Sequence, residues 1–108
     1  MSNSDNSFNN VSVKRNANVY FNGGVTSRTI TFNNGDIKTL GMMQPGEYEF
    51  NTDKKEIMEI QLGKVSVLLP GETEWKQYEA GEIFEVKANA TFKITALTLT
   101  DYCCSFVD

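Results

Sequence analysis

Glu56 is the residue whose place in the sequence points most directly to chemistry. In the stretch 56–62, alternate residues share one face of an extended strand, and Met58, Ile60 and Leu62 make the Glu56 face apolar. This alternation turns the Glu56 carboxylate toward the interior. An unpaired buried carboxylate costs several kcal/mol, so Glu56 needs a hydrogen-bonding partner, a raised pKa or a ligand. The alternative is that Glu56 lies at the open end of the strand and is solvated.

Two adjacent cysteines, Cys103 and Cys104, are the other reactive groups in the chain. Neighbours in a strand point to opposite faces, so a disulfide between them would be strained. We expect two reduced thiols, one of them packed inward. We do not expect a cysteine nucleophile, because the sequence contains no histidine to activate it and no cluster of cations beside the pair.

The elements that must position these side chains are short strands. Runs rich in Val, Ile, Thr, Phe and Tyr are separated by turn signals such as Asn-Gly, Pro-Gly and Ala-Gly, and no long window shows helical periodicity. The expected strands lie at 25–32, 56–62, 64–69, 82–87 and 91–99. In the last of these, Phe92, Ile94 and Ala96 alternate with polar residues and are expected to face inward. The pattern is typical of a small all-β barrel or sandwich.

Length and charge limit the classes of function. The 108 residues suit one domain, and we expect a flexible amino-terminal tail at 1–17, rich in Asn and Ser, before a barrel domain at 18–108. The net charge is −4 and no block of Lys and Arg occurs, which argues against a nucleic-acid partner. No apolar run reaches membrane-spanning length and no secretory signal opens the chain, so we expect no membrane partner and a cytoplasmic location.

The spacing around Glu56 resembles the cupin motifs. Glu56 and Gly63 have the Glu-x6-Gly spacing of the first motif, with Phe50 and Thr52 at its two histidine positions, and Phe92 falls at the histidine of the second motif. The resemblance implies a cupin-like jelly-roll β-barrel. Because the chain has no histidine, a cupin-type metal is not expected. Aromatic rings in place of imidazoles predict an aromatic-walled cavity with Thr52 and Glu56 as its polar groups, suited to a flat and partly polar ligand.

A closer resemblance runs from about Val19 to Phe106. Its motifs include Gly41-Met42-Met43, Pro45-Gly46-Glu47-Tyr48, Val67-Leu68-Leu69-Pro70-Gly71 and Asp101-Tyr102 with Cys104. These segments are similar, in order, to those of the pyrimidine/purine nucleoside phosphorylase family of small bacterial cupin-like proteins. The resemblance implies a homodimer that cleaves purine and pyrimidine nucleosides with inorganic phosphate as co-substrate and no cofactor. The products would be the free base and a pentose 1-phosphate.

This activity suggests roles for the residues of the cavity. Cleavage of an N-glycosidic bond develops positive charge on the sugar, so Glu56 is the candidate to stabilise that charge or to bind the ribose hydroxyls. Phe50, Phe92 and Tyr48 are candidates to stack on the base without reading its edge, and Thr52 is a further substrate contact. For Tyr48, packing in the core is an equal alternative.

Phosphate requires cations or backbone amides, and Arg28 and Lys38 are the candidate cations. Ser105 stands where members of the family often have an arginine, which puts the usual phosphate contact in doubt. A second hypothesis is therefore a non-catalytic cupin module that binds a nucleoside-like molecule without cleaving it.

Overall fold

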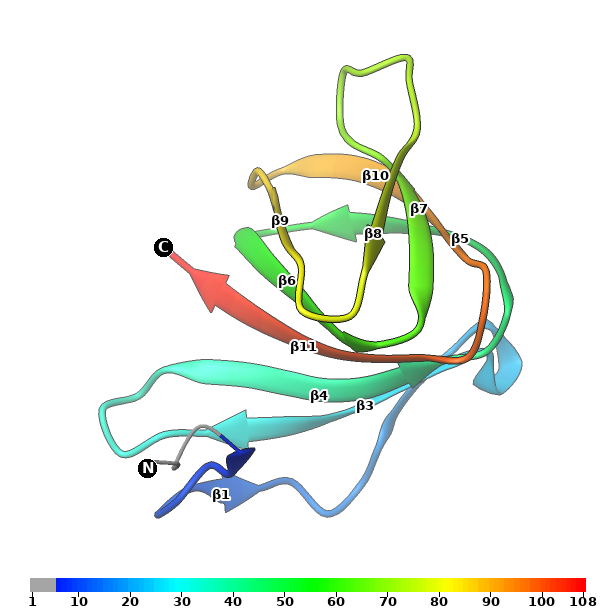
Figure 1. The fold of residues 1–108 in the computed structure, drawn as a ribbon. Helices are drawn as coiled ribbons and strands as arrows, with labels where there is room; N and C mark the ends of the chain where they lie inside the picture. The colour runs from blue at the N-terminus through cyan, green and yellow to red at the C-terminus, as the bar shows by residue number, and fades with distance from the viewer. Residues whose placement is uncertain (1–5) are drawn as a thin grey trace.

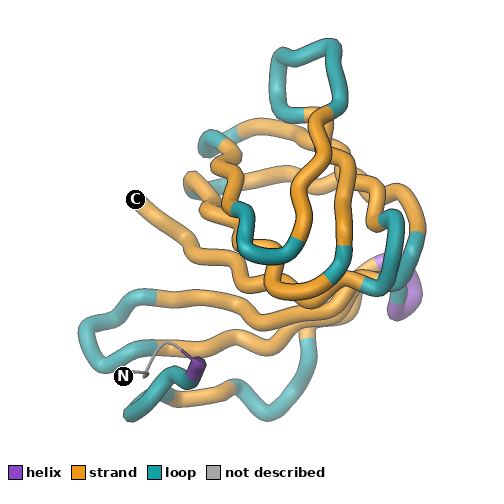
Figure 2. Tube along the Cα trace, viewed as in Figure 1, coloured by secondary structure: helices purple, strands orange, loops and turns teal. Residues whose placement is uncertain are grey.

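Strands make up almost all the regular structure of the protein (Figures 1 and 2). The computed structural model describes residues 6–108. Its strands are β1 Ser12–Val13, β2 Asn18–Tyr20, β3 Val25–Thr31, β4 Ile37–Met43, β5 Gly46–Thr52, β6 Lys55–Leu62, β7 Lys64–Leu68, β8 Lys76–Glu79, β9 Ile83–Val86, β10 Ala90–Ala96 and β11 Thr100–Val107. A short 3₁₀ turn, η2 at Phe21–Gly23, joins β2 to β3. The all-β prediction is confirmed.

The strands form two antiparallel sheets. The larger sheet has the order β1-β3-β4-β11-β6-β9, with β2 also paired to β3, and the smaller has the order β5-β10-β7-β8. In Figure 1, β3 and β4 lie below the strands of the smaller sheet, and β11 and β6 continue the larger sheet from β4. Residues near the two ends of the chain therefore meet in one sheet.

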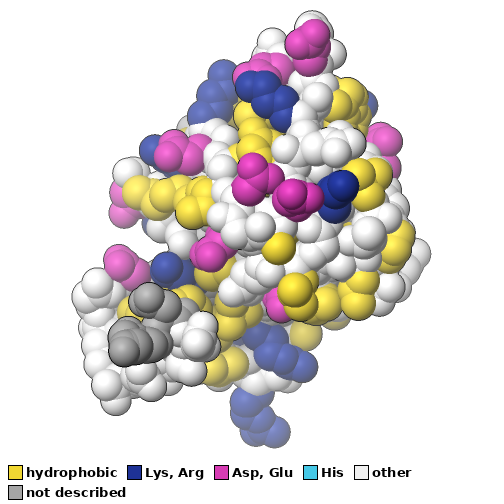
Figure 3. Space-filling view, in the orientation of Figure 1, with side chains coloured by type: hydrophobic (Ala, Val, Ile, Leu, Met, Phe, Trp, Pro, Cys, Tyr) yellow, Lys and Arg dark blue, Asp and Glu magenta, His cyan; other side chains and the backbone are white. Residues whose placement is uncertain are grey.

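The core lies between the two sheets and follows the alternation of the sequence. Phe92, Ile94 and Ala96 of β10 are buried, as predicted, and Val65 and Val67 of the neighbouring β7 are fully enclosed. Because successive side chains of a strand alternate between faces, each of these strands gives one row of apolar side chains to the interior. Outside the core, Figure 3 shows acidic and basic side chains interspersed over the barrel, without a broad basic surface on that face.

A β-bulge interrupts the predicted pattern in β6. Asp101 of β11 pairs with Leu62, whereas the next residue, Tyr102, pairs with Ile60, so the register shifts at this point. The extra residue turns the end of β6 away from the core. Leu62, predicted to face inward with Met58 and Ile60, is 63% exposed, and that part of the prediction is wrong.

The segment before residue 18 is attached to the larger sheet. We predicted a flexible tail at 1–17, but Ser12 and Val13 form β1 against β3, and the Lys14 backbone N–H donates to the Thr29 carbonyl at 2.9 Å. The edge of β3 offers unpaired backbone groups that the polar segment can satisfy, which composition alone does not reveal. Residues 1–5 of the predicted tail lie outside the described part of the chain. Within residues 6–108, no helix is long and apolar enough to cross a membrane.

Candidate active site

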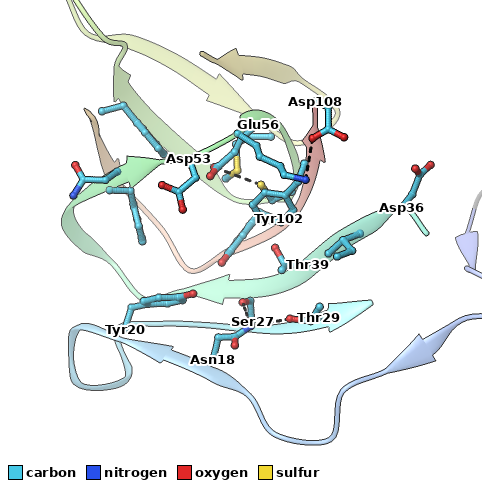
Figure 4. A pocket seen from close by; sticks show the side chains of 18 of the residues that line it. Asn18, Tyr20, Ser27, Thr29, Asp36, Thr39, Asp53, Glu56, Tyr102 and Asp108 are labelled. Carbon is cyan, nitrogen blue, oxygen red and sulfur yellow. Dashed lines mark hydrogen bonds and ion pairs between the residues drawn. The ribbon is translucent and has the colours of Figure 1, made fainter. Parts of the chain in front are cut away.

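A cavity of about 590 Å³ opens between the β3–β4 layer and the first residues of β6 (Figure 4). Its walls differ in chemistry. One wall carries hydroxyl and amide groups, and the facing wall carries carboxyl groups; aromatic rings of β2, β5 and β10 lie at one end. The first wall comprises Asn18, Ser27, Thr29 and Thr39, the second includes Asp53 and Glu56, and the rings are Tyr20, Phe50 and Phe92.

Glu56 lies in this cavity, near the start of β6. Met58 and Ile60 on the same face are buried, as predicted, whereas Glu56 itself is half-buried because it lines the open part of the barrel. Burial raises the pKa of the Glu56 carboxyl above its usual value; a hydrogen bond from Cys104 lowers it, and the nearby charge of Asp53 raises it. The site thus holds one carboxyl group whose protonation is sensitive to its surroundings.

The two cysteines occupy opposite faces of β11. The Cys104 Sγ donates to Glu56 Oε1 at 3.5 Å inside the cavity, whereas Cys103 is buried outside the cavity lining. Both are free thiols, as expected. Burial is the main cause that raises the pKa of each thiol, and the Glu56 charge raises that of Cys104 further. Cys104 is therefore a neutral hydrogen-bond donor to Glu56 rather than a thiolate nucleophile.

Two phenylalanines form the aromatic end of the cavity. Phe50 of β5 and Phe92 of β10 are directly opposed in register, and their rings stack with centroids 5.8 Å apart at an interplanar angle of 26°. Tyr20 packs edge-on against Phe50 at 6.0 Å. A planar ligand can stack on this surface without any hydrogen bond to its edge.

Two of the predicted substrate contacts lie outside the cavity lining. The Tyr48 hydroxyl donates to the Gln44 carbonyl at 2.7 Å, and its ring is buried in the core. The Thr52 hydroxyl donates to the Lys87 carbonyl at 2.7 Å and accepts from the Ala90 N–H at 3.1 Å. Local backbone partners satisfy both hydroxyls, so these residues brace the loops beside the cavity.

The two predicted phosphate cations also lie away from the cavity lining. Arg28 donates from Nη1 to the Arg15 carbonyl at 2.6 Å. Lys38 places its Nζ over the ring of Phe8, 5.4 Å from the centroid. Both side chains hold the amino-terminal segment against the sheet.

Sequence reasoning missed the hydroxyl wall. Its first member, Asn18, donates from Nδ2 to Ser27 Oγ at 3.1 Å and to Thr29 Oγ1 at 3.2 Å. Ser27 and Thr29 share one face of β3 with the buried Val25, because they are two and four residues further along the strand. This spacing is the sequence signal that could have identified them. The position of Asn18 depends on the pairing of β2 with β3, for which the sequence gives no comparable signal.

Tyr102 also lines the cavity, and Gly41 sets its position. Gly41 pairs with Tyr102 across β4 and β11, and a Cβ at residue 41 would lie 2.6 Å from the Tyr102 hydroxyl oxygen and would collide with the Thr26 carbonyl oxygen. Only the bare glycine backbone leaves space for the phenol. Burial, more than the neighbouring Cys104, raises the pKa of Tyr102 well above its usual range, so the hydroxyl keeps its proton.

The residues at the cupin ligand positions do not fit a metal ion. Phe50 and Phe92 carry no ligand atoms, the Thr52 hydroxyl is engaged with backbone, and the sequence contains no histidine. Within residues 6–108, no group of three His, Cys, Asp or Glu side chains is placed to hold an ion. The donor set suits an organic ligand better than a metal.

Two antiparallel sheets around a cavity open at one end define a cupin-like barrel. An RmlC-like cupin from Shewanella frigidimarina NCIMB 400 shares this fold, with a TM-score of 0.68 over 93% of this chain and 86% of that chain, at 18% identity. The chain belongs to the pyrimidine/purine nucleoside phosphorylase family, whose family model matches residues 15–106. The predictions of fold class and family are confirmed.

Similarity to members of the family extends over nearly the whole chain. The pyrimidine/purine nucleoside phosphorylase of Geotalea uraniireducens (strain Rf4) is 60% identical over 101 residues, which cover 94% of this chain and 97% of the relative. That of Hydrogenovibrio crunogenus is 55% identical with the same coverage. The crystal structure of a protein of unknown function from Acinetobacter sp. ADP1 matches with a TM-score of 0.90 at 37% identity, covering 94% of this chain and 98% of that one.

Proposed function

We propose that the protein cleaves purine and pyrimidine nucleosides with inorganic phosphate, releasing the free base and a pentose 1-phosphate without a metal ion. The similarity to named pyrimidine/purine nucleoside phosphorylases supports the reaction. The observation that carries it on this chain is the carboxyl group of Glu56 in a cavity with aromatic rings at one end. The reaction needs these two parts, a negative charge beside the sugar and a surface for the base.

Glu56 is the proposed catalytic residue. As the bond between sugar and base lengthens, positive charge develops on the sugar, and a fixed carboxylate in a partly desolvated cavity stabilises it more than water does. The Cys104 thiol holds one carboxylate oxygen at 3.5 Å, which leaves the other oxygen free to face the substrate. Stacking on Phe50 and Phe92 would bind any base, because every base has a π-face, and this explains broad base specificity.

A homodimer in the cytoplasm completes the proposal. The support for a dimer is two exposed apolar side chains on the outer face of the larger sheet, Met42 and Leu62, which lie on either side of Asp101 in one cross-strand row. Exposed apolar groups rimmed by polar residues are typical of protein–protein interfaces. Light scattering coupled to gel filtration measures the mass, and a monomer at all concentrations would contradict this part of the proposal.

Non-catalytic binding of a nucleoside-like ligand is the second candidate. It is favoured by the position of Lys54, the one cation among the described residues that line the cavity, whose Nζ is paired with Asp108 Oδ1 at 2.9 Å. Ser105, at the position of the family arginine, is not a lining residue, so its identity does not by itself remove a group from the cavity. The two candidates differ in whether phosphate is consumed.

The deciding experiment incubates the purified protein with uridine or adenosine, with and without inorganic phosphate, and measures free base by chromatography. We expect base to be released only when phosphate is present, and a chelator to leave the rate unchanged. Nucleoside binding without release of base would support the second candidate. Loss of activity on adding a chelator would contradict the metal-free mechanism.

A further inference from the structure

Phosphate must bind in a cavity that is poor in positive charge. Among the described residues that line it, Lys54 is already paired with Asp108, and Asp36, Asp53 and Glu56 add negative charge. A site that binds phosphate by simple attraction to lysine or arginine is therefore absent from these walls. Any phosphate that enters must be held by neutral hydrogen-bond donors.

The hydroxyl wall supplies such donors in a fixed pattern. Asn18 donates its amide hydrogens to the oxygens of Ser27 and Thr29, at 3.1 Å and 3.2 Å. A hydroxyl that accepts such a bond still has its own hydrogen to donate. Ser27 is only 5% exposed, so its donor is buried and oriented rather than freely rotating in water. The Ser27 hydroxyl, which accepts from Asn18, forms a hydrogen bond with Tyr102, so the Tyr102 hydroxyl keeps its own hydrogen for a ligand in the cavity.

The register of the sheet places further donors beside these two. One cross-strand row contains Ser27, Gly41 and Tyr102, and the adjacent row on the same face contains Thr29, Thr39 and Cys104. Neighbouring strands lie about 4.8 Å apart, and the Tyr102 phenol extends over Gly41, where its hydroxyl oxygen lies 2.6 Å from the position of a Gly41 Cβ and forms a hydrogen bond with Ser27. Figure 4 shows Thr39 and Tyr102 between Ser27 and Thr29 on one side and the carboxyl groups of Asp53 and Glu56 on the other.

Glu56 faces these donors and can only accept a hydrogen bond when it is ionised. An oxyanion placed between the wall and Glu56 must therefore accept from the hydroxyls and donate to the carboxylate. Inorganic phosphate near neutral pH carries a proton that it can donate, whereas sulfate carries none. A sulfate ion in this position could not donate to the carboxylate, so an oxygen lone pair of Glu56 would face an oxygen lone pair of the sulfate.

We propose that Thr39 and Tyr102 donate to bound phosphate, with Ser27 orienting the Tyr102 hydroxyl and Glu56 accepting a hydrogen bond from the phosphate, and that the site therefore selects phosphate over sulfate. The assignment rests on the proposed function, since it names the co-substrate site of that reaction. It replaces Arg28 and Lys38, which lie away from the cavity lining. Glu56 stays ionised in this arrangement, because it accepts a hydrogen bond from phosphate and does not take the proton, so its charge remains available to the sugar.

Isothermal titration calorimetry of the full chain with inorganic phosphate, arsenate and sulfate, at matched ionic strength, tests the assignment directly. We expect phosphate and arsenate to bind at least about tenfold more tightly than sulfate, because sulfate leaves the buried acceptor unpaired. Ser27→Ala and Thr39→Val should each weaken phosphate binding about tenfold or less, the size of one lost hydrogen bond. Thr26→Val removes a hydroxyl from the adjacent residue of β3, outside the phosphate cavity, and is the matched control.

Glu56→Gln tests whether Glu56 determines the preference for phosphate without affecting the fold. The variant replaces an acceptor with a side chain that can donate, so the preference for phosphate over sulfate should shrink or reverse while the circular dichroism spectrum stays the same. Equal binding of sulfate and phosphate to the unaltered protein would overturn the assignment. So would loss of phosphate binding in Arg28→Gln or Lys38→Gln with no change in Ser27→Ala.

The titration also distinguishes this inference from the proposed function. Selective phosphate binding with no release of base from any nucleoside would support the site and contradict the reaction. Phosphate-dependent release of base, inhibited by sulfate at concentrations near the phosphate KM, would support the reaction and contradict the site.

Discussion

The closed and open parts of the barrel are built from the same strands but place different demands on their side chains: the closed part requires apolar packing, and the open part requires directed polar groups. In the closed part, Ile60, Val65 and Ile94 are fully buried and belong to the hydrophobic core cluster. In the open part, four residues before Ile60 on the same face of β6, Glu56 faces a cavity and touches Cys104 through one bond. Position along one strand therefore decides whether a side chain is packed in the core or faces the cavity.

The difference shows which part of the molecule tolerates change. A core side chain can be replaced by another of similar volume at small cost, because apolar contacts have no fixed direction. The cavity groups act through single directed bonds, such as those from Asn18 to Ser27 and Thr29. Stability and activity should therefore respond to different substitutions, and the predictions below test that separation.

Glu56→Gln should give the largest effect, and it should fall on turnover rather than on folding. Removing the negative charge beside the developing positive charge is expected to lower kcat about a thousandfold, within the range for an essential electrostatic or acid–base group. The measurement is release of base from uridine at saturating phosphate, with the melting temperature as control. Full activity in the variant would remove Glu56 from the mechanism.

Ile60→Ala should lower the stability of the fold and leave turnover nearly unchanged. Truncating a fully buried isoleucine is expected to lower the free energy of unfolding by about 3 kcal/mol, within the range for large-to-small core substitutions. Urea denaturation measures the change in stability. At a temperature where the variant is folded, kcat should stay within about twofold of the original value, because Ile60 does not line the cavity. A large fall in kcat without loss of stability would show that core and cavity are coupled.

Cys104→Ala should shift the pH dependence of activity. The Cys104 bond lowers the pKa of Glu56, so its removal raises that pKa and moves the acid limb of the kcat profile to higher pH. At a pH on that limb we expect a loss of about threefold to tenfold, the size of one weak hydrogen bond. Cys104→Ser, which keeps a donor, should restore part of the profile. Cys103→Ala is the matched control on the opposite face, and an equal shift in that variant would contradict the positioning role.

Thr52→Val tests whether Thr52 supports the fold or contacts the substrate. The variant loses the bond to the Lys87 carbonyl and is expected to be about 1 kcal/mol less stable. Urea denaturation measures that loss, while the KM for uridine distinguishes a brace from a direct substrate contact. A raised KM with unchanged stability would place Thr52 in contact with the substrate.

Glu56 should also make the stability of the protein depend on pH, and this effect should be the smallest. Burial raises the pKa of Glu56 in the folded state above its usual value of 4.5, so its contribution is fully present below that pH and is lost as pH rises through the folded pKa. Melting temperatures measured across this window should fall in the original protein relative to Glu56→Gln as pH rises. Parallel curves would show that burial of the carboxylate carries no such cost.

The sequence was informative where one strand could be interpreted by itself. Alternation placed Met58, Ile60, Phe92 and Ile94 in the core and turned Glu56 toward the interior. It failed at Leu62, because a bulge depends on the partner strand and not on the strand that carries it.

The site was less predictable because its contacts join residues far apart in the chain. The bond from Cys104 to Glu56 spans 48 positions, and the Thr52 bond to the Lys87 carbonyl spans 35. The composition of a single segment cannot show that backbone groups satisfy the hydroxyls of Thr52 and Tyr48. Arg28 and Lys38 were chosen by charge alone, whereas the amino-terminal segment determines where those charges lie.

Gly41 limits how this protein can be redesigned. Any side chain at residue 41 would meet the Tyr102 hydroxyl oxygen at 2.6 Å, so a library that aims to alter substrate choice should keep both positions fixed. Ile37 is a better position to randomise, because it lines the same cavity and takes no part in the hydrogen bonds of the hydroxyl wall. Variants at this position can change the shape of the cavity while the backbone that carries the phenol stays intact.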